Sequence, residues 1–103
     1  MIIFQQNVLD YFDDLIHILF KEEYFGFVES SEIFVDKIID FVYKDIYTFP
    51  SKKTPKKLIH LGSNYIFYKS NQRTTWYIFF EQFDNNYLIT NIINSNSEEV
   101  KFL

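Results

Sequence analysis

Apolar residues recur at helical spacing in the first part of the chain. Val8, Phe12, Leu15 and Leu19 follow one another at intervals of four, three and four residues, which places them on one face of a helix. Asn7 stands just before this series, and an asparagine side chain is suited to cap the free amide groups of a first helical turn. The pattern predicts a helix that is capped by Asn7 and buries one face.

A second helical pattern follows and is more regular. Its apolar positions lie on one face of the predicted helix: Val35, Ile38, Ile39, Val42 and Ile46. Gly26 is suited to end the first helix or the turn after it, because glycine enters the left-handed region without a steric cost. Ser30 or Ser31, just before Glu32, is a signal for the start of the second helix. This helix has to end before Pro50, because the residue that precedes a proline is pushed out of helical geometry.

The pattern changes after Gly62 to runs of aromatic and β-branched residues, which are typical of strands. Three such runs are present, at residues 65–69, 74–83 and 87–93. Residues 84–86, Asp-Asn-Asn, separate the last two runs, and asparagine tolerates the positive φ that a tight hairpin requires. The second half of the chain therefore predicts a three-stranded antiparallel meander.

The remaining segments complete a single domain. Residues 2–4 predict a short first strand, and residues 51–57, which hold four lysines and no apolar periodicity, predict a loop. Residues 1–103 are expected to form one α+β domain, in which a helical hairpin packs on one face of a small antiparallel meander.

The middle strand of the meander is apolar on both faces. One face carries Trp76, Ile78 and Phe80, and the other carries Tyr77, Phe79 and Phe83. Two helices cover only one side of such a sheet, so the second face needs a cover of its own or remains as an exposed apolar patch.

Three alternatives could shield this second face from solvent. The C-terminal residues Phe102 and Leu103 are placed to fold back across it. A protein partner or a second copy of the chain would instead contact Tyr77, Phe79 and Phe83. The third alternative is an aromatic platform for nucleotide bases, formed by Tyr65, Phe67 and Tyr77.

Composition removes several classes of function. The chain has no cysteine, which excludes disulfides, thiolate zinc sites and a cysteine nucleophile, and its two glycines are too few for a Walker loop or a dinucleotide fingerprint. Asp13, Asp14 and His17 lie within one helical turn, and Asp13 and His17 have a spacing that suits a shared metal ion, but the only other histidine in the chain is His60. We expect neither a metal nor a cofactor.

The N-terminus lacks the features of a signal peptide and no apolar run is long enough to span a membrane, so a cytoplasmic protein without membrane contact is expected.

The charges are distributed unevenly, and the basic groups suggest a chemistry. The net charge is −4, yet the second half of the chain is basic. Its candidate residues lie before the sheet and on its first hairpin: Lys56, Lys57, His60, Lys69 and Arg73. RNA cleavage by the 2′-hydroxyl needs a base, an acid and positive charge beside the phosphate. His60 or Tyr77 would transfer protons, Arg73 and Lys69 would supply the charge, and the two remaining lysines would bind RNA. The alternative is a solvated basic rim on an acidic protein.

The order of the elements and three segments, residues 61–65, 75–80 and 87–90, resemble the RelE/ParE superfamily of toxins from toxin–antitoxin systems. Members of this superfamily have a short first strand, a helical hairpin and a meander whose middle strand reads as an aromatic residue followed by aliphatic ones. The matching segment of this chain, Trp76–Phe80, reads Trp-Tyr-Ile-Phe-Phe. The messenger-RNA-cleaving branch carries basic residues on the first meander strand and at the start of the second. Lys69 and Arg73 stand near these positions.

This resemblance implies a toxin-like protein of a bacterial or phage genome with an antitoxin as its partner. In one branch such a protein is a metal-independent endoribonuclease that acts on messenger RNA at the ribosome. In the gyrase-poisoning branch, and in a non-catalytic interaction module of the same fold, the target is a protein and no catalytic set is needed. A homodimer is compatible with either function.

Overall fold

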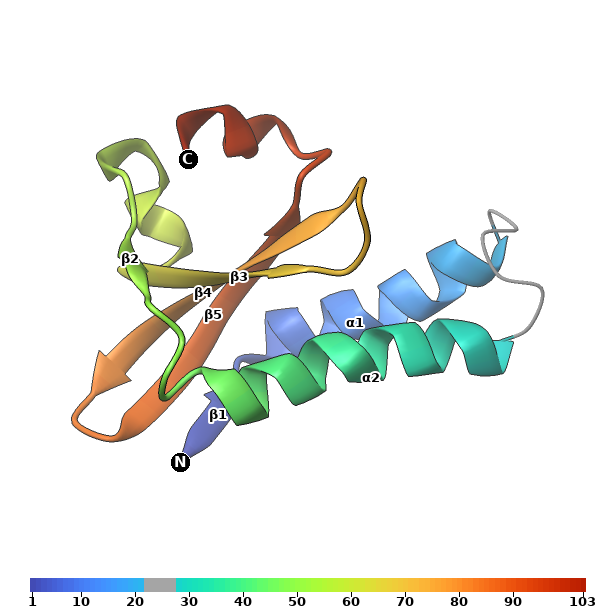
Figure 1. Ribbon diagram of the computed structural model, residues 1–103, viewed down its shortest axis with the longest axis horizontal. Helices are drawn as coiled ribbons and strands as arrows, with labels where there is room; N and C mark the ends of the chain where they lie inside the picture. Colours follow the sequence, from blue (N-terminus) through green and yellow to red (C-terminus); the bar gives the residue numbers. More distant parts are fainter. Residues whose placement is uncertain (22–27) are drawn as a thin grey trace.

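The computed structural model describes residues 1–21 and 28–103, and Gly26 lies outside them. Figure 1 shows the long helices on one side of the sheet and the short 3-10 helices, η1 and η2, on the other. The elements in chain order are β1 (Ile2–Phe4), α1 (Gln6–Lys21), α2 (Val28–Asp45), β2 (Lys52–Lys53), η1 (Lys56–Leu61), β3 (Asn64–Lys69), β4 (Thr75–Phe83), β5 (Asn86–Asn94) and η2 (Glu98–Phe102). The α+β class predicted from the sequence is confirmed.

The sheet has five strands in the order β1-β5-β4-β3-β2. The meander β3-β4-β5 is antiparallel, as predicted, and the short first strand is confirmed. β1 pairs in parallel with β5, which makes the sheet mixed. The prediction of a loop at residues 51–57 is wrong in part, because β2 adds to the outer edge of β3 and η1 begins at Lys56.

Helix α1 begins at Gln6, two residues earlier than a cap at Asn7 predicts. The backbone carbonyl of Gln5 accepts hydrogen bonds from the amides of Val8 and Leu9, at 3.0 and 3.2 Å. Asn7 lies inside the helix, so its assignment as the cap is wrong. Its side-chain amide instead donates to the carbonyl oxygen of Thr90, at 3.0 Å, and ties the start of α1 to β5.

Helix α2 ends at Asp45, before Pro50 as predicted, and it begins at Val28. Ser30 and Ser31 therefore lie within its first turns and do not precede it, which corrects the predicted start. The apolar stripe is confirmed with one difference: Ile38 is fully buried, whereas Ile39 is only partly buried at the margin of the core.

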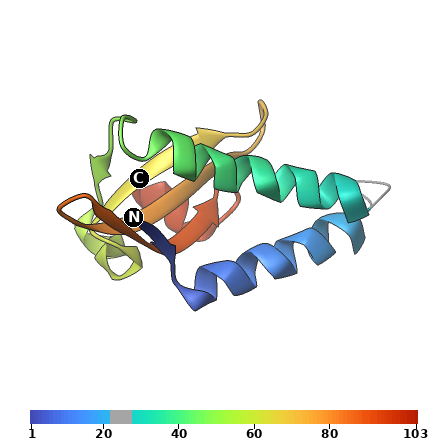
Figure 2. The same ribbon diagram turned by 90° about the horizontal axis from the view of Figure 1, so that it is seen from below.

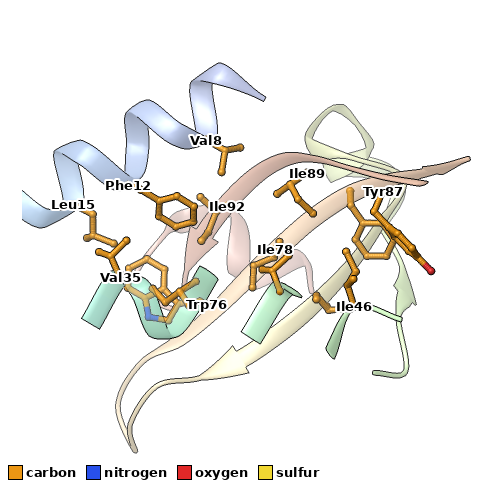
Figure 3. Packing of buried hydrophobic residues seen from close by; sticks show 14 residues of the cluster. Val8, Phe12, Leu15, Val35, Ile46, Trp76, Ile78, Tyr87, Ile89 and Ile92 are labelled. Carbon is orange, nitrogen blue, oxygen red and sulfur yellow. The ribbon is translucent and has the colours of Figure 1, made fainter. Parts of the chain in front are cut away.

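The main core lies between the two helices and the sheet. Figure 3 shows Val8, Phe12 and Leu15 of α1 directed into the core, with Phe12 toward Ile92 of β5 and Leu15 toward Val35 of α2. The two helices lie apart over the sheet and approach each other at the end that projects beyond it (Figure 2). This projection leaves part of the apolar face of the helical pair without sheet beneath it.

The second face of the sheet is covered by the chain itself. Leu58 and Leu61 of η1 form a second apolar cluster with Tyr65 and Phe79, and Leu103 packs against it. The sequence offered the C-terminal residues as one possible cover for this face, and Leu103 does pack there. The larger cover, η1, falls in a segment whose first part was predicted to be a loop.

A β-bulge fixes η1 to the sheet. Phe79 pairs with Asn91 and Phe80 pairs with Ile89, so Thr90 is an extra residue in β5. The Thr90 hydroxyl donates to the carbonyl oxygen of Leu61, the last residue of η1. The bulge therefore turns the Thr90 side chain toward η1, where it holds the end of this helix against the sheet.

Candidate functional site

A groove of about 920 Å³ lies between the helical pair and the turn that joins β3 to β4. We call it the hairpin groove. It is lined by Leu15, Ile18, Leu19, Phe34, Asn71, Gln72, Arg73, Thr74, Trp76, Asn94 and Asn96. Its position follows from the projection of the helices past the end of the sheet.

The inner wall of the groove is apolar and well packed. Trp76 is buried, and its indole nitrogen donates to the Ser70 hydroxyl at 3.1 Å. The rings of Tyr11 and Phe34 meet the indole edge to face, with centroid distances of 6.4 and 6.1 Å. Ile18 stands at the mouth of the groove with half of its surface exposed. Since such rings and contacts hold the indole in place, the inner wall is a preformed apolar surface.

The rim of the groove is polar and is held by the β3–β4 turn. The Asn71 side-chain oxygen accepts from the backbone amides of Arg73 and Thr74, at 2.8 and 2.9 Å. This arrangement fixes the turn and leaves the Arg73 guanidinium exposed. The guanidinium forms no ion pair with any described residue. Arg73 is also the only charged residue among the described ones that line the groove.

The β5 side of the rim is fixed by its own hydrogen bonds. The Asn94 side-chain oxygen accepts from the backbone amide of Asn96 at 2.8 Å. Burial raises the pKa of Tyr11, and a hydrogen bond with the Asn94 side chain opposes this shift. Asn94 therefore connects the rim to the aromatic residues behind the inner wall.

The structure separates the predicted catalytic residues into two groups. Lys69 and Arg73 lie at the β3–β4 turn, whereas His60 lies on η1, which precedes the opposite end of β3. From Asn64 to Lys69 the strand covers about 16 Å at the usual rise per residue. All three charged or titratable side chains are exposed. His60 is thus not brought to the basic residues with which it was expected to act.

Tyr77 lies on the covered face of the sheet. It is half-buried and packs against the second cluster, with its ring 6.2 Å from Tyr65 and 6.4 Å from Phe67. Burial, and to a lesser extent the neighbouring Tyr77, raise the pKa of Tyr65. The expected aromatic platform is therefore closed at Tyr65, which is buried, and half-covered at the other two rings.

The residues predicted to contact a partner differ in their accessibility. Phe79 is fully buried under η1, which corrects the expectation that it is free to contact a partner. Phe83, at the end of β4, is well exposed. Lys56 and Lys57, predicted to bind RNA, are exposed on η1, and the Lys57 ammonium lies over the Phe102 ring.

Sequence reasoning assigned the apolar residues of the groove to the core, and among the polar residues of its rim it singled out only Arg73. The sequence does contain a signal for this rim. Antiparallel pairing of Trp76 with Asn94 brings residues 71–74 and 94–96 together at one end of the sheet. Amide and hydroxyl side chains are concentrated in both segments. The helical wall has no comparable signal, since it depends on how far the helices project.

Other chemistry finds less support in the described residues. The His17 ring nitrogen Nδ1 lies 2.9 Å from the backbone carbonyl oxygen of Asp13, so the ring is engaged with the main chain of its own helix. Among residues 1–21 and 28–103, no three metal-ligating side chains come together. Within the same residues, neither helix has the length and apolar character that a membrane span requires.

Comparison with known proteins finds no matching family model, no matching curated protein and no matching solved structure.

Proposed function

We propose that this protein is a protein-binding module with a RelE/ParE-like fold, and that it holds an antitoxin-like partner in the hairpin groove. The segment that enters the groove carries apolar side chains toward Trp76 and Leu15 and an acidic side chain toward Arg73. The function is binding, and no bond of the partner is broken.

The observation that carries this proposal is the groove itself. A concave surface with an apolar wall and a few fixed polar groups at its rim is the usual form of a specific binding site. The lone guanidinium at the rim favours a carboxylate, because a planar guanidinium pairs with a carboxylate through two hydrogen bonds. The rim amides are suited to hydrogen-bond the main chain of a bound segment.

RNA cleavage receives less support from the same geometry. Proton transfer requires the base or acid to lie within hydrogen-bond reach of the reacting group, directly or through one water. His60 stands roughly the length of β3 from Arg73, and Tyr77 lies half-buried on the covered face. Lys69 and Arg73 lie at the β3–β4 turn without either of the two residues, His60 and Tyr77, that were expected to transfer protons beside them.

Co-expression with the product of the adjacent reading frame tests the proposal. We expect a stable complex in which the fluorescence of Trp76 changes, and this residue is the only tryptophan in the chain. Ile18→Glu should weaken the complex at least about tenfold, because an unpaired carboxylate in an apolar contact is costly. Ile59→Glu is the matched control, since Ile18 and Ile59 are 50% and 52% exposed and Ile59 lies on η1.

A complex that Ile18→Glu leaves intact, or that Ile59→Glu weakens equally, would contradict binding in the groove. Mapping of transcript ends after induced expression provides the second measurement. Intact messages are expected. Codon-phased cuts that disappear in Arg73→Ala would overturn the proposal in favour of an endoribonuclease.

A further inference from the structure

The sheet ends in two edges that differ in their chemistry. β2, at one edge, consists of Lys52 and Lys53, and Pro50 stands two residues before it. Lysine and proline are among the usual means by which an edge strand is kept from pairing with another chain. β1, at the other edge, has the sequence Ile-Ile-Phe, and Figure 1 places it beside the N-terminus at the margin of the sheet. The edge at β1 therefore lacks the guard that the edge at β2 carries.

The free hydrogen-bonding groups of β1 follow from its pairing with β5. The amide of Tyr87 donates to the carbonyl oxygen of Met1 at 2.8 Å. Because backbone groups alternate in direction along a strand, those of Ile3 also face β5, whereas those of Ile2 and Phe4 point to the open edge. These outward groups form no hydrogen bond with any residue that the structure describes.

Exposed apolar side chains flank the open edge on both faces of the sheet. Phe4 packs on Phe12 of α1, with a centroid distance of 6.1 Å, so Ile3 points to the face turned away from the helices. Ile3 is 51% exposed there, and Met1, two residues before it, is 71% exposed. On the helical face, the ring of Tyr43 lies 5.7 Å from that of Phe4 and is 52% exposed. Such a concentration of apolar surface is typical of a contact with another chain.

A second copy of the chain fits this edge by symmetry. In an antiparallel pair with a two-fold axis at Ile3, Ile2 of each copy lies opposite Phe4 of the other. All of these residues direct their backbone groups to the open edge, so the two pairs form four hydrogen bonds. Ile3 then faces Ile3 of the other copy as a non-hydrogen-bonded pair. Residues 1–5 carry no charged side chain, so the paired segments have no side-chain repulsion to overcome.

We infer that this protein forms a two-fold dimer in which the β1 strands of the two copies pair in antiparallel orientation. The pairing joins two five-stranded sheets into one continuous sheet. Because β1 has only three residues, the contact is smaller than the roughly 800 Å² per partner of a standard interface. The dimer is therefore in a concentration-dependent equilibrium with the monomer. The hairpin groove is formed by other elements, so dimerisation does not depend on the proposed protein partner.

Sedimentation velocity of the chain without an N-terminal tag measures this equilibrium from micromolar to near-millimolar concentration. The wild-type chain should change from monomer to dimer over this range. Ile3→Lys places two ammonium groups opposite each other at the axis and should raise the dissociation constant at least about tenfold. Ile59→Lys is the matched control, since Ile59 is 52% exposed but lies on η1, and it should leave the dissociation constant unchanged.

A second pair of variants tests the strand pairing itself. Ile2→Pro removes an amide that points to the open edge, and Ile2→Ala shortens the same side chain but keeps the amide. Ile2→Pro should dimerise about tenfold more weakly than Ile2→Ala, because the dimer loses two hydrogen bonds. Circular dichroism of each variant checks that the fold is retained.

A disulfide tests the register, since the chain has no cysteine of its own. Cα atoms of a non-hydrogen-bonded pair lie about 4.5 Å apart, a separation that a disulfide spans. Ile3→Cys should therefore form a covalent dimer in a glutathione redox buffer, and Ile59→Cys should remain a monomer.

Four results would each overturn the inference: a wild-type monomer at every concentration, equal weakening by Ile59→Lys, equal dissociation constants for Ile2→Pro and Ile2→Ala, or no covalent dimer of Ile3→Cys. Pairing of β1 with a strand of the co-expressed partner, in a chain that is otherwise monomeric, would overturn it as well.

Discussion

Gly62 occupies a position where a single methyl group should have a large effect on stability. The residue lies between η1 and β3 with φ of 153° and ψ of 156°, a region that is essentially restricted to glycine. A Cβ atom there would lie 2.5 Å from the Thr90 hydroxyl oxygen, 3.0 Å from Phe79 Cβ and 3.0 Å from the backbone nitrogen of Phe80. The first neighbour is a side chain that can rotate, but the third is main chain in the centre of the sheet.

The expected cost of Gly62→Ala combines two effects. Forcing an alanine into this backbone conformation costs about 1–3 kcal/mol. Overpacking against atoms that cannot yield costs about 1–3 kcal/mol more. We therefore expect the free energy of unfolding to fall by roughly 2–6 kcal/mol, a large share of the 5–15 kcal/mol typical of a domain.

Urea denaturation measures this change, with the fluorescence of buried Trp76 as the reporter. Thr90→Ala serves as the partner in a double-mutant cycle. By itself it removes the hydrogen bond to Leu61 and should cost about 0.5–1.5 kcal/mol. With Gly62→Ala it also removes the shortest clash, so the double variant should lose less than the two single variants together. A loss below about 1 kcal/mol for Gly62→Ala, or strict additivity, would refute this reasoning.

Two further predictions concern the core and the pH dependence of stability. Ile38→Ala should lower the free energy of unfolding by about 2–5 kcal/mol, because Ile38 is fully buried. Ile39→Ala should lower it by no more than about half as much, because Ile39 is only partly buried. Equal losses of stability in urea denaturation would contradict the assigned helix face. The pKa of Tyr65 is raised in the folded state, so its contribution is complete below the unfolded value of about 10 and is lost as pH rises through the folded pKa. The wild-type chain should therefore lose stability above pH ~10 more steeply than Tyr65→Phe, and identical pH profiles in urea would contradict the raised pKa.

The local elements could be predicted from the sequence because each has a pattern of its own. The stripe around Val35 and Val42 requires a helix, and the alternation around Ile78 requires a strand, whatever surrounds them. The separation of His60 from Arg73 was implicit in the same patterns, because an extended strand lies between them. Treating both as one site ignored the length of that strand.

Contacts between distant segments depended on the tertiary structure. The addition of β1 beside β5, the extra residue Thr90 that holds η1, and the contact of Lys57 with the Phe102 ring all join parts of the chain whose local patterns carry no information about one another. The hairpin groove is of the same kind, since it exists only because the helices project past the sheet. Periodicity along a chain identifies the face that an element buries, whereas the partner of that face is chosen by the packing of the whole domain.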